Sequence, residues 1–419
     1  MRPLRFCHLT TFYPPHNFGG DGIGIQRLVR GLAKLGHHST VVHDVDAYRL
    51  LAKNKEPKDL GEPPGVEVVR LQSDWGKLSC LLTQQLGRPV VHGGRIAELL
   101  ERGEFDVVNF HNISLVGGPG ILKYGDAVKL YMAHEHWLVC PSHVLWRHNR
   151  EVCTGRECTK CVLSYGRPPQ AWRYTSYLER ELHHVDAFIA MSRFSRDKHK
   201  EFGFPRDMEV LSYFLPAPER SGPTASVSKP LHAKPYFLFV GRLEKIKGLD
   251  DVLPIFRNYK DADLLICGDG EYAETLKRAG AGIDNVRFLG RVSNEDLANY
   301  YEHALALIVP SICFETFGII LIEAFRSKIP VIARRIGPFP EIMELARGGE
   351  LFGSPDELVA ALRRFQNDPH HRTRCAEAGH SAFLEHWTEQ AVIPRYLDIV
   401  RRAAERKGRT EIARALASS

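Results

Sequence analysis

The sequence predicts an α/β protein built from two doubly wound parallel sheets. Short apolar stretches rich in branched and aromatic residues alternate with amphipathic segments of helical length, a pattern that favours parallel strands joined by helical crossovers. The chain has 419 residues, 44% of them hydrophobic, which gives room for two or three packed domains. Residues 216–235 are rich in Pro, Ser and Ala and lack apolar periodicity, which predicts a linker between two halves.

Each half has its own series of predicted elements. In the first half, the apolar runs predict strands at Arg5–Thr10, His38–Asp44, Val66–Leu71, Phe105–His111, Lys129–Ala133 and Ala187–Met191. In the second half, they predict strands at Tyr236–Val240, Leu264–Cys267, Asn285–Gly290, Ala304–Val309 and Pro330–Ala333. Helices are expected at Ile25–Leu35, Ala171–His184, Pro355–Phe365 and Pro369–His386.

Composition narrows the class of protein. The chain has 56 basic and 50 acidic residues, a net charge of +6, which favours anionic ligands but is too mild to indicate nucleic-acid binding. The start of the chain does not resemble a signal peptide, and no apolar run reaches the length of a membrane span. We therefore expect a cytoplasmic protein, with membrane contact limited to peripheral binding at the inner face. Nine cysteines, an odd number, indicate reduced thiols.

A glycine-rich segment, Gly19-Gly20-Asp21-Gly22-Ile23-Gly24, follows the first strand. A strand, a glycine-rich turn and a helix can together cradle a pyrophosphate, so a dinucleotide-binding site of the dehydrogenase type is a competing hypothesis. Arg27 stands where that fingerprint requires its third glycine, which disfavours the dehydrogenase hypothesis. A plain tight turn stays open as the alternative.

Two further segments carry charged residues after predicted strands. Asp44-Val45-Asp46 has the spacing of a metal-binding Asp-x-Asp, but we interpret it as a strand end, because basic residues elsewhere would make a metal redundant for phosphate binding. Those basic residues are Arg242 and Lys247, in the segment Gly241–Gly248. Two cations there could hold a pyrophosphate through charge-assisted hydrogen bonds. The alternative is a pair of solvated basic side chains.

Glu315 and Glu323 flank Thr-Phe-Gly and an apolar run within Ser311–Phe325. A helix that begins near Phe317-Gly318-Ile319 would present free backbone N–H groups and a positive dipole end to a phosphate. The two glutamates could then accept hydrogen bonds from hydroxyls on either side of it. Two solvated acids on a surface helix are the alternative.

These motifs resemble those of the retaining glycosyltransferases of family 4. The segment from Glu315 to Glu323 matches that family's Glu-x-Phe-Gly-x4-Glu, and Gly241–Gly248 matches its Gly-Arg-Leu…Lys-Gly. The resemblance implies the GT-B arrangement, in which two Rossmann-like domains face one another across a cleft. It implies an acceptor domain at 1–215 with a Cys-rich insertion at 140–161, a linker at 216–235 and a donor domain at 236–390. Residues 391–419 are expected to form a helix that crosses back to the acceptor domain, followed by a loose basic tail.

The resemblance also implies roles for individual residues. His134, followed by Glu135 where the family has Asp, is expected to contact the transferred sugar. A structural histidine that makes hydrogen bonds at a strand end stays open as the alternative. The catalytic set is His134, Glu315, Arg242 and Lys247. The donor-binding set is Gly19, Gly20, Arg242, Lys247, Arg291, Val292, Glu315, Phe317, Gly318, Ile319 and Glu323. Gly337–Glu341 is expected to be a loop over the nucleotide base.

The function implied by the resemblance is transfer of a hexose with retention, without a catalytic cofactor. The donor would be a UDP-, GDP- or ADP-hexose and the acceptor a glycan or lipid-linked molecule, as in polysaccharide and cell-envelope synthesis. A nucleotide-sugar-binding protein without transferase activity is one alternative, although both acids, both cations and the histidine are present. A nucleotide-sugar epimerase of the same fold is the other, and the paired motifs argue against it.

Four cysteines follow His134 in the pattern C-x12-C-x4-C-x2-C: Cys140, Cys153, Cys158 and Cys161. The two-residue gap of the last pair lets both thiolates reach one tetrahedral ion, and the intervening segment has little apolar periodicity to order it. A structural zinc is therefore one hypothesis, with His143 or His148 as an alternative ligand to Cys140. Reduced, unligated thiols are the other.

Overall fold

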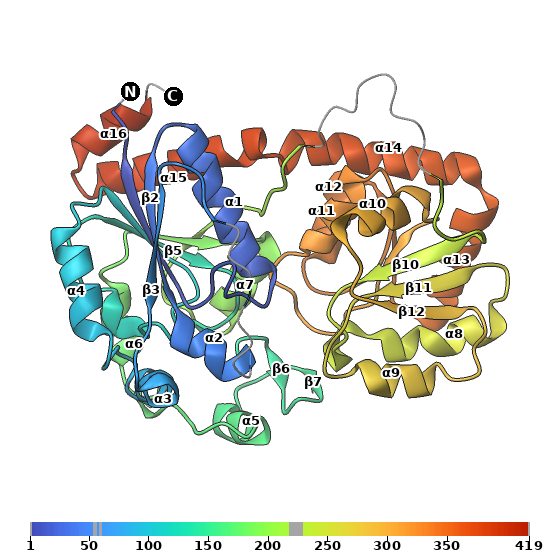
Figure 1. The fold of residues 1–419 in the computed structure, drawn as a ribbon, viewed down its shortest axis with the longest axis horizontal. Coiled ribbons are helices and arrows are strands. Elements are labelled where there is room, and N and C mark those ends of the chain that lie inside the picture. Colours follow the sequence, from blue (N-terminus) through green and yellow to red (C-terminus); the bar gives the residue numbers. More distant parts are fainter. Residues whose placement is uncertain (1, 53–56, 58–60, 218–228, 418–419) are drawn as a thin grey trace. The chain divides into compact units, whose positions relative to one another are not determined.

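The computed structural model describes residues 2–52, 57, 61–217 and 229–417, which form two compact units (Figure 1). Unit 1 contains the chain up to Tyr213 and the segment from Val392 onward, and unit 2 contains Phe214–Ala391. Residues 218–228, the greater part of the predicted linker, lie outside the described residues. At the end of the predicted linker, residues 231 and 232 contact other residues of unit 2. The Leu231 amide donates to Asn299 at 3.1 Å, and His232 lies 2.9 Å from Asp263.

Unit 1 is organised around a seven-stranded sheet in the order β3-β2-β1-β4-β5-β8-β9. Every neighbouring pair in it is parallel. The strands are β1 (Arg5–Thr10), β2 (His38–Asp44), β3 (Val66–Leu71), β4 (Val107–Phe110), β5 (Val128–Ala133), β8 (Ala187–Ala190) and β9 (Met208–Val210). The bounds of β1, β2 and β3 are those predicted. Strand β9, three residues long, is too short to give a pattern.

The helices of unit 1 lie on both faces of this sheet (Figure 1). They are α1 (Gly20–Lys34), α2 (Val45–Ala52), α3 (Gly76–Leu86), α4 (Gly93–Arg102), α5 (Cys158–Ser164), α6 (Tyr177–Leu182) and α7 (Arg193–Glu201), and the hairpin β6 (Trp146–Arg147) with β7 (Glu151–Val152) precedes α5. The single helix predicted at Ala171–His184 is wrong. Thr175 has extended backbone angles, and its hydroxyl binds the Trp172 carbonyl at 2.7 Å and the Tyr177 amide at 3.2 Å, which separates a short 3-10 turn from α6.

Unit 2 contains a six-stranded parallel sheet in the order β12-β11-β10-β13-β14-β15. Its strands are β10 (Tyr236–Val240), β11 (Asp263–Cys267), β12 (Val286–Gly290), β13 (Leu307–Val309), β14 (Val331–Arg334) and β15 (Gly349–Phe352). Its helices are α8 (Leu253–Asn258), α9 (Ala273–Ala279), α10 (Asn294–His303), α11 (Ile319–Arg326), α12 (Phe339–Ala346), α13 (Pro355–Asn367) and α14 (Pro369–His386). The loop predicted at Gly337–Glu341 is wrong from Phe339 onward, because α12 begins there with Pro340 in its first turn, where proline is tolerated.

The C-terminal segment packs on unit 1. Helix α15 (Glu389–Arg406) buries Tyr396, whose hydroxyl accepts a hydrogen bond from Asn109 of β4 at 2.6 Å. Arg402 also pairs with Glu209 of β9 at 2.9 Å. The loose basic tail predicted after α15 is wrong, since α16 (Thr410–Ala417) buries Ile412, Ala413 and Leu416 on one face. Arg and Lys around those residues hid this apolar stripe in the sequence.

Candidate functional site

The charged motifs of unit 2 meet at one edge of its sheet. Gly241–Gly248 follows β10 and Ser311–Gly318 follows β13, and these two strands are neighbours with parallel pairing. Strand β10 also pairs with β11, so the strand order reverses between β10 and β13. Ligands of open α/β sheets bind at such a switch point, outside the carboxyl ends of the strands. Gly248, at φ +72°, lies against β13: a Cβ there would be 2.1 Å from the Pro310 carbonyl oxygen.

Lys247 and Glu315 form an ion pair at this edge. Lys247 Nζ lies 2.6 Å from Glu315 Oε1, and the Ser311 hydroxyl lies 3.3 Å from the same oxygen. Both charged side chains keep about a quarter of their surface exposed, 24% and 26%. Burial acts to raise the pKa of Glu315, but Lys247, Ser311 and Arg242 together hold that pKa below its usual range. The carboxylate is therefore ionised and reachable from solvent.

Arg242 supplies a second, more exposed cation to this edge. Its guanidinium pairs with Glu244 at 3.0 Å, and 58% of its side chain is exposed. An exposed pair of this kind contributes little to stability, so Arg242 can exchange Glu244 for an incoming anion. The sequence prediction that Arg242 and Lys247 stand together after β10 is consistent with this geometry, while their roles stay a proposal.

Helix α11 begins at Ile319, as predicted from the Phe317-Gly318-Ile319 segment. Gly318 has φ +125°, and a Cβ there would lie 2.8 Å from the ring of Phe339, so glycine is required at this turn. Phe317 is buried, and Glu323 lies one turn inside α11, half-buried. Because α11 begins four positions after Glu315, its free N–H groups lie close in sequence to the glutamate of the Lys247–Glu315 pair. Arg291, exposed, and Val292, half-buried, follow β12, the edge strand two strands away from β10.

In unit 1, His134 is the centre of a buried hydrogen-bonded chain that sequence reasoning missed. His8 Nδ1 lies 3.1 Å from His111 Nε2, His111 Nδ1 lies 2.8 Å from His134 Nε2, and His134 Nδ1 lies 2.5 Å from the Tyr213 hydroxyl. His8 is within β1, and His111 and His134 directly follow β4 and β5. The order β1-β4-β5 in the sheet explains why three distant histidines meet.

Burial keeps this chain neutral. It lowers the pKa of His8 and of His134 to about 3, lowers the pKa of His111 well below its usual value and raises the pKa of Tyr213 well above its usual value. Each neutral imidazole donates through one nitrogen and accepts through the other, so all the hydrogen bonds run in one direction. Both ring nitrogens of His134 therefore already have protein partners.

The glycine-rich segment lies at the start of α1, which begins at Gly20, five residues before the predicted start. Gly19 is the N-cap in an extended conformation. Gly24 faces the ring of Tyr213: a Cβ there would lie 2.5 Å from Tyr213 Cε1. Gly22 is equally restricted, at 2.4 Å from Asn17 Oδ1. Two of these glycines thus serve close packing, and Gly24 allows Tyr213 to reach His134.

The four cysteines predicted as zinc ligands line one small pocket between the β6–β7 hairpin and α5. The backbone amide of His148 donates to Cys161 Sγ at 3.3 Å. In the described part of the chain, no three of these sulfur atoms all lie within 4.8 Å of one another. Among the described residues, the three-ligand group with atoms within 4.8 Å of one another is a different one, formed by Asp44, Asp46 and His92.

Comparisons with known proteins define the class of protein to which this chain belongs. Residues 18–213 match the model of Glycosyltransferase Family 4, and residues 225–382 match that of Glycosyl transferases group 1. The chain therefore has the two parallel-sheet domains of a GT-B glycosyltransferase. It belongs to the family 4 glycosyltransferases, as the motifs of its second half predicted. In the described part of the chain, no helix is both long enough and apolar enough to cross a bilayer.

Curated relatives share part of the sequence. The GDP-mannose-dependent monoacylated alpha-(1-6)-phosphatidylinositol monomannoside mannosyltransferase of Corynebacterium glutamicum is 28% identical over 52% of this chain and 62% of its own length. The phosphatidyl-myo-inositol mannosyltransferase of Mycobacterium leprae is 35% identical over 30% of this chain and 37% of its own length. The chain thus spans less than two thirds of these two relatives. A Mycobacterium tuberculosis glycogen synthase is 24% identical over 93% of this chain and 92% of its own length.

Solved structures share the fold at low identity. A sucrose-phosphate synthase from Thermosynechococcus elongatus superposes with a TM-score of 0.71 at 17% identity, over 95% of this chain and 98% of that one. HepE from Anabaena, solved with UDP-glucose, superposes with a TM-score of 0.64 at 16% identity, over 99% of this chain and 100% of that one. These likenesses confirm the predicted fold class.

Proposed function

We propose that this chain transfers a hexose from a nucleoside-diphosphate sugar to a glycan or lipid-linked acceptor, with retention at the anomeric carbon. The observation that carries the proposal is the Lys247–Glu315 pair at the β10/β13 switch point, 2.6 Å apart and partly exposed. A cation and an anion that face solvent together can exchange partners. Lys247 would turn to a phosphate, and Glu315 would be released to accept hydrogen bonds from sugar hydroxyls.

The chemistry depends on stabilising the leaving group. As the bond between the anomeric carbon and the donor phosphate breaks, charge grows on the phosphate, and Arg242, Lys247 and the N–H groups at the start of α11 are arranged to receive it. The acceptor oxygen bonds the same face of the anomeric carbon, and its proton passes to the departing phosphate. Glu323, one turn into α11, would accept from the ribose hydroxyls.

Relatives support this class of donor. Curated relatives include a GDP-mannose-dependent mannosyltransferase, and HepE has been solved in complex with UDP-glucose. We therefore propose UDP-, GDP- or ADP-hexose as the donor class for this chain. A role in polysaccharide or envelope synthesis fits the lipopolysaccharide core glycosyltransferase LpsD of Rhizobium meliloti, which is 26% identical over 53% of this chain.

We place His134 at the transferred sugar as a neutral imidazole, in line with its position after β5. Because both of its ring nitrogens have protein partners, a sugar hydroxyl would have to replace one of them. His134→Ala and Glu315→Ala should then reduce turnover more than nucleotide affinity. Equal losses of both quantities would show that these two residues bind the nucleotide instead.

We also propose a structural zinc ion at Cys140, Cys153, Cys158 and Cys161. The shared pocket and the His148 N–H···S bond support it. The loop would close on the ion, because sulfur atoms around tetrahedral zinc lie about 3.8 Å apart. Elemental analysis should show that Cys158→Ser/Cys161→Ser holds one zinc equivalent less than the wild type. Metal-free wild-type protein of unchanged stability and activity would rule the site out.

A product assay tests the transferase proposal directly. Purified protein is incubated with UDP-, GDP- and ADP-hexoses and a membrane or glycan extract, and nucleotide release and the anomeric configuration of the product are measured by NMR. One donor should give acceptor-dependent nucleotide release and a product with the donor's anomeric configuration. Binding of a donor without acceptor-dependent release would favour the binding-protein alternative, and a product of inverted configuration would contradict the retaining mechanism.

A further inference from the structure

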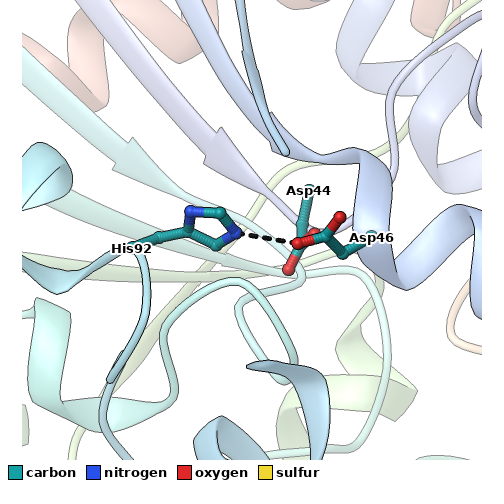
Figure 2. A group of neighbouring side chains, drawn as sticks. All are labelled: Asp44, Asp46 and His92. Carbon is teal, nitrogen blue, oxygen red and sulfur yellow. Dashed lines mark hydrogen bonds and ion pairs between the residues drawn. The ribbon is translucent and has the colours of Figure 1, made fainter. Parts of the chain in front are cut away.

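Three buried polar side chains from separate segments of unit 1 point toward one another (Figure 2). Asp44 is the last residue of β2, Asp46 lies in the first turn of α2, and His92 is the N-cap of α4. Their exposed fractions are 1%, 4% and 7%. One ligand atom from each lies within 4.8 Å of the other two. The group lies at the carboxyl edge of the sheet of unit 1, whereas the proposed donor-binding residues of the Arg242, Lys247 and Glu315 group belong to unit 2.

Both carboxylate oxygens of Asp46 have hydrogen-bond partners, whereas only one oxygen of Asp44 has one. Asp46 Oδ2 lies 3.1 Å from His92 Nε2 and accepts from the Ser73 hydroxyl at 2.7 Å, and the Ser73 amide donates to Asp46 Oδ1 at 3.2 Å. The Ala47 amide donates to Asp44 Oδ1 at 3.1 Å. In the described part of the chain, Asp44 Oδ2 is buried without a hydrogen-bond partner.

This arrangement is unfavourable as it stands. A carboxyl group that is buried beside a second acid and has one oxygen without a hydrogen-bond partner carries a desolvation cost that one histidine does not offset. The Cys80 thiol is also buried close enough for both carboxylates to raise its pKa further. Within the described residues, neither Asp44 nor Asp46 forms a hydrogen bond or an ion pair with a Lys or Arg side chain. A positive charge between the three ligands would remove the cost.

We propose that Asp44, Asp46 and His92 bind a divalent first-row transition-metal ion, zinc or manganese. One imidazole nitrogen with two carboxylates suits these ions, whereas calcium and magnesium favour sites made of oxygen alone. Ser73 would orient Asp46 through its two hydrogen bonds, as residues behind metal ligands commonly do. Asp44 Oδ2 would gain the partner it lacks.

The ion would fasten three segments of the carboxyl edge. It would join the β2–α2 junction to the start of α4, and Ser73 would extend this link to the segment after β3. Because all three ligands are shielded from solvent, the ion would be structural and would take no part in bond making. The sequence predicts a strand end at Asp44-Val45-Asp46, and β2 does end at Asp44, but Val45 and Asp46 already belong to α2. The third ligand of the proposed site, His92, lies 46 positions after Asp46.

Metal titration of the full-length protein tests this site. Chelator-treated protein is titrated separately with Zn²⁺, Mn²⁺, Co²⁺ and Mg²⁺, with calorimetry, thermal unfolding and Co²⁺ absorption as readouts. Zn²⁺ or Mn²⁺ should bind at one equivalent per chain that remains in Cys158→Ser/Cys161→Ser. In that variant the Co²⁺ spectrum should lack the thiolate charge-transfer band.

Asp44→Asn is the decisive variant, because it keeps the size of the side chain and the bond from the Ala47 amide. It should abolish this equivalent, and as a neutral group it should leave the metal-free protein at least as stable as metal-free wild type. Asp74→Asn, an exposed acid in the neighbouring loop, is the control and should bind metal as wild type does. Ser73→Ala should weaken binding about 10–100-fold. Undiminished binding by Asp44→Asn, or absence of a cysteine-independent equivalent in wild type, would overturn the proposal.

Discussion

The two units differ in how deeply they bury the polar groups near the carboxyl edges of their sheets. In unit 1 these groups are buried and bind one another: the chain from His8 to Tyr213, and Asp44 with Asp46 and His92. In unit 2 the corresponding groups, Arg242, Lys247 and Glu315, keep part of their surface in solvent. Buried pairs are difficult to exchange because a partner left alone stays desolvated, whereas exposed pairs exchange readily. Unit 2 is thus suited to bind and release a charged ligand, and unit 1 to keep a fixed geometry.

The largest expected effect is that the stability of unit 1 depends on pH more strongly than the stability of unit 2. Burial lowers the pKa values of His8, His111, His134, His136 and His199, all of them in unit 1. Below about pH 6.5 the unfolded chain binds protons that the folded unit does not, so stability is complete above that pH and falls as pH decreases toward the folded values. Below that pH, each of these histidines would lower the free energy of unfolding by up to about 1.4 kcal/mol per pH unit.

Thermal unfolding between pH 7.5 and pH 5 measures this effect. Trp137, Trp146 and Trp172 are buried in unit 1, so tryptophan fluorescence follows mainly that unit. Its transition should move to lower temperature by more than the transition of unit 2, monitored by a label at an exposed position of α13. A fluorescence transition that does not change with pH would show that these histidines are protonated without loss of structure.

Lys247→Met should give the next largest effect. The substitution removes the cation proposed to stabilise the leaving phosphate and leaves Glu315 without its 2.6 Å partner, so kcat/KM should fall about 10²–10³-fold. Lys245→Met changes an exposed lysine in the same turn and should retain nearly full activity. Similar losses in both variants would indicate a nonspecific charge effect rather than a specific phosphate contact.

Gly24→Ala should disturb unit 1 without affecting nucleotide binding. The added Cβ would meet the Tyr213 ring at 2.5 Å, so either α1 or Tyr213 must move, with a loss of stability of about 1–3 kcal/mol. Movement of Tyr213 would also release its bond to His134. Denaturant unfolding and nucleotide calorimetry check both statements; a variant with wild-type stability would show that Tyr213 can move at no cost.

Glu323→Ala should have the smallest effect of this series. Loss of an acceptor for the ribose hydroxyls should weaken nucleotide binding about tenfold, which corresponds to about 1.4 kcal/mol. Glu344→Ala, at an exposed position of helix α12, is the control and should bind the nucleotide as the wild type does. If only the turnover of Glu323→Ala falls, Glu323 acts on the sugar rather than on the ribose.

Elements whose burial pattern is continuous were predicted well from the sequence. Strands β1, β2 and β10 have the predicted bounds and are buried along most of their length, because parallel strands buried on both faces are short apolar runs in the sequence. The start of α11 was also predicted, since Gly318 marks its turn. The start of α1 was missed because glycines at 20, 22 and 24 indicate a turn, although here two of them allow close packing.

The buried networks of unit 1 could not be predicted, for a different reason. His8, His111 and His134 become neighbours only through the order β1-β4-β5. His92 approaches Asp46 only in the folded unit, because β3 and α3 lie between them in the chain. The available signal was a histidine directly after β4 and another directly after β5, with a third inside β1. Spacing along the chain identifies residues within one turn or helix, whereas these contacts depend on strand order.

Thermal unfolding with nucleotide sugars tests the central claim, that unit 2 binds its donor through side chains that exchange partners and without a metal. UDP-, GDP- and ADP-hexoses are compared with and without a chelator, in wild type and in Lys247→Met. One donor, at a hundred times its Kd, should stabilise unit 2 of the wild type by about 2.7 kcal/mol, to the same extent with the chelator present, and should have little effect on Lys247→Met. Stabilisation that disappears with the chelator, or no stabilisation by any donor, would contradict the account.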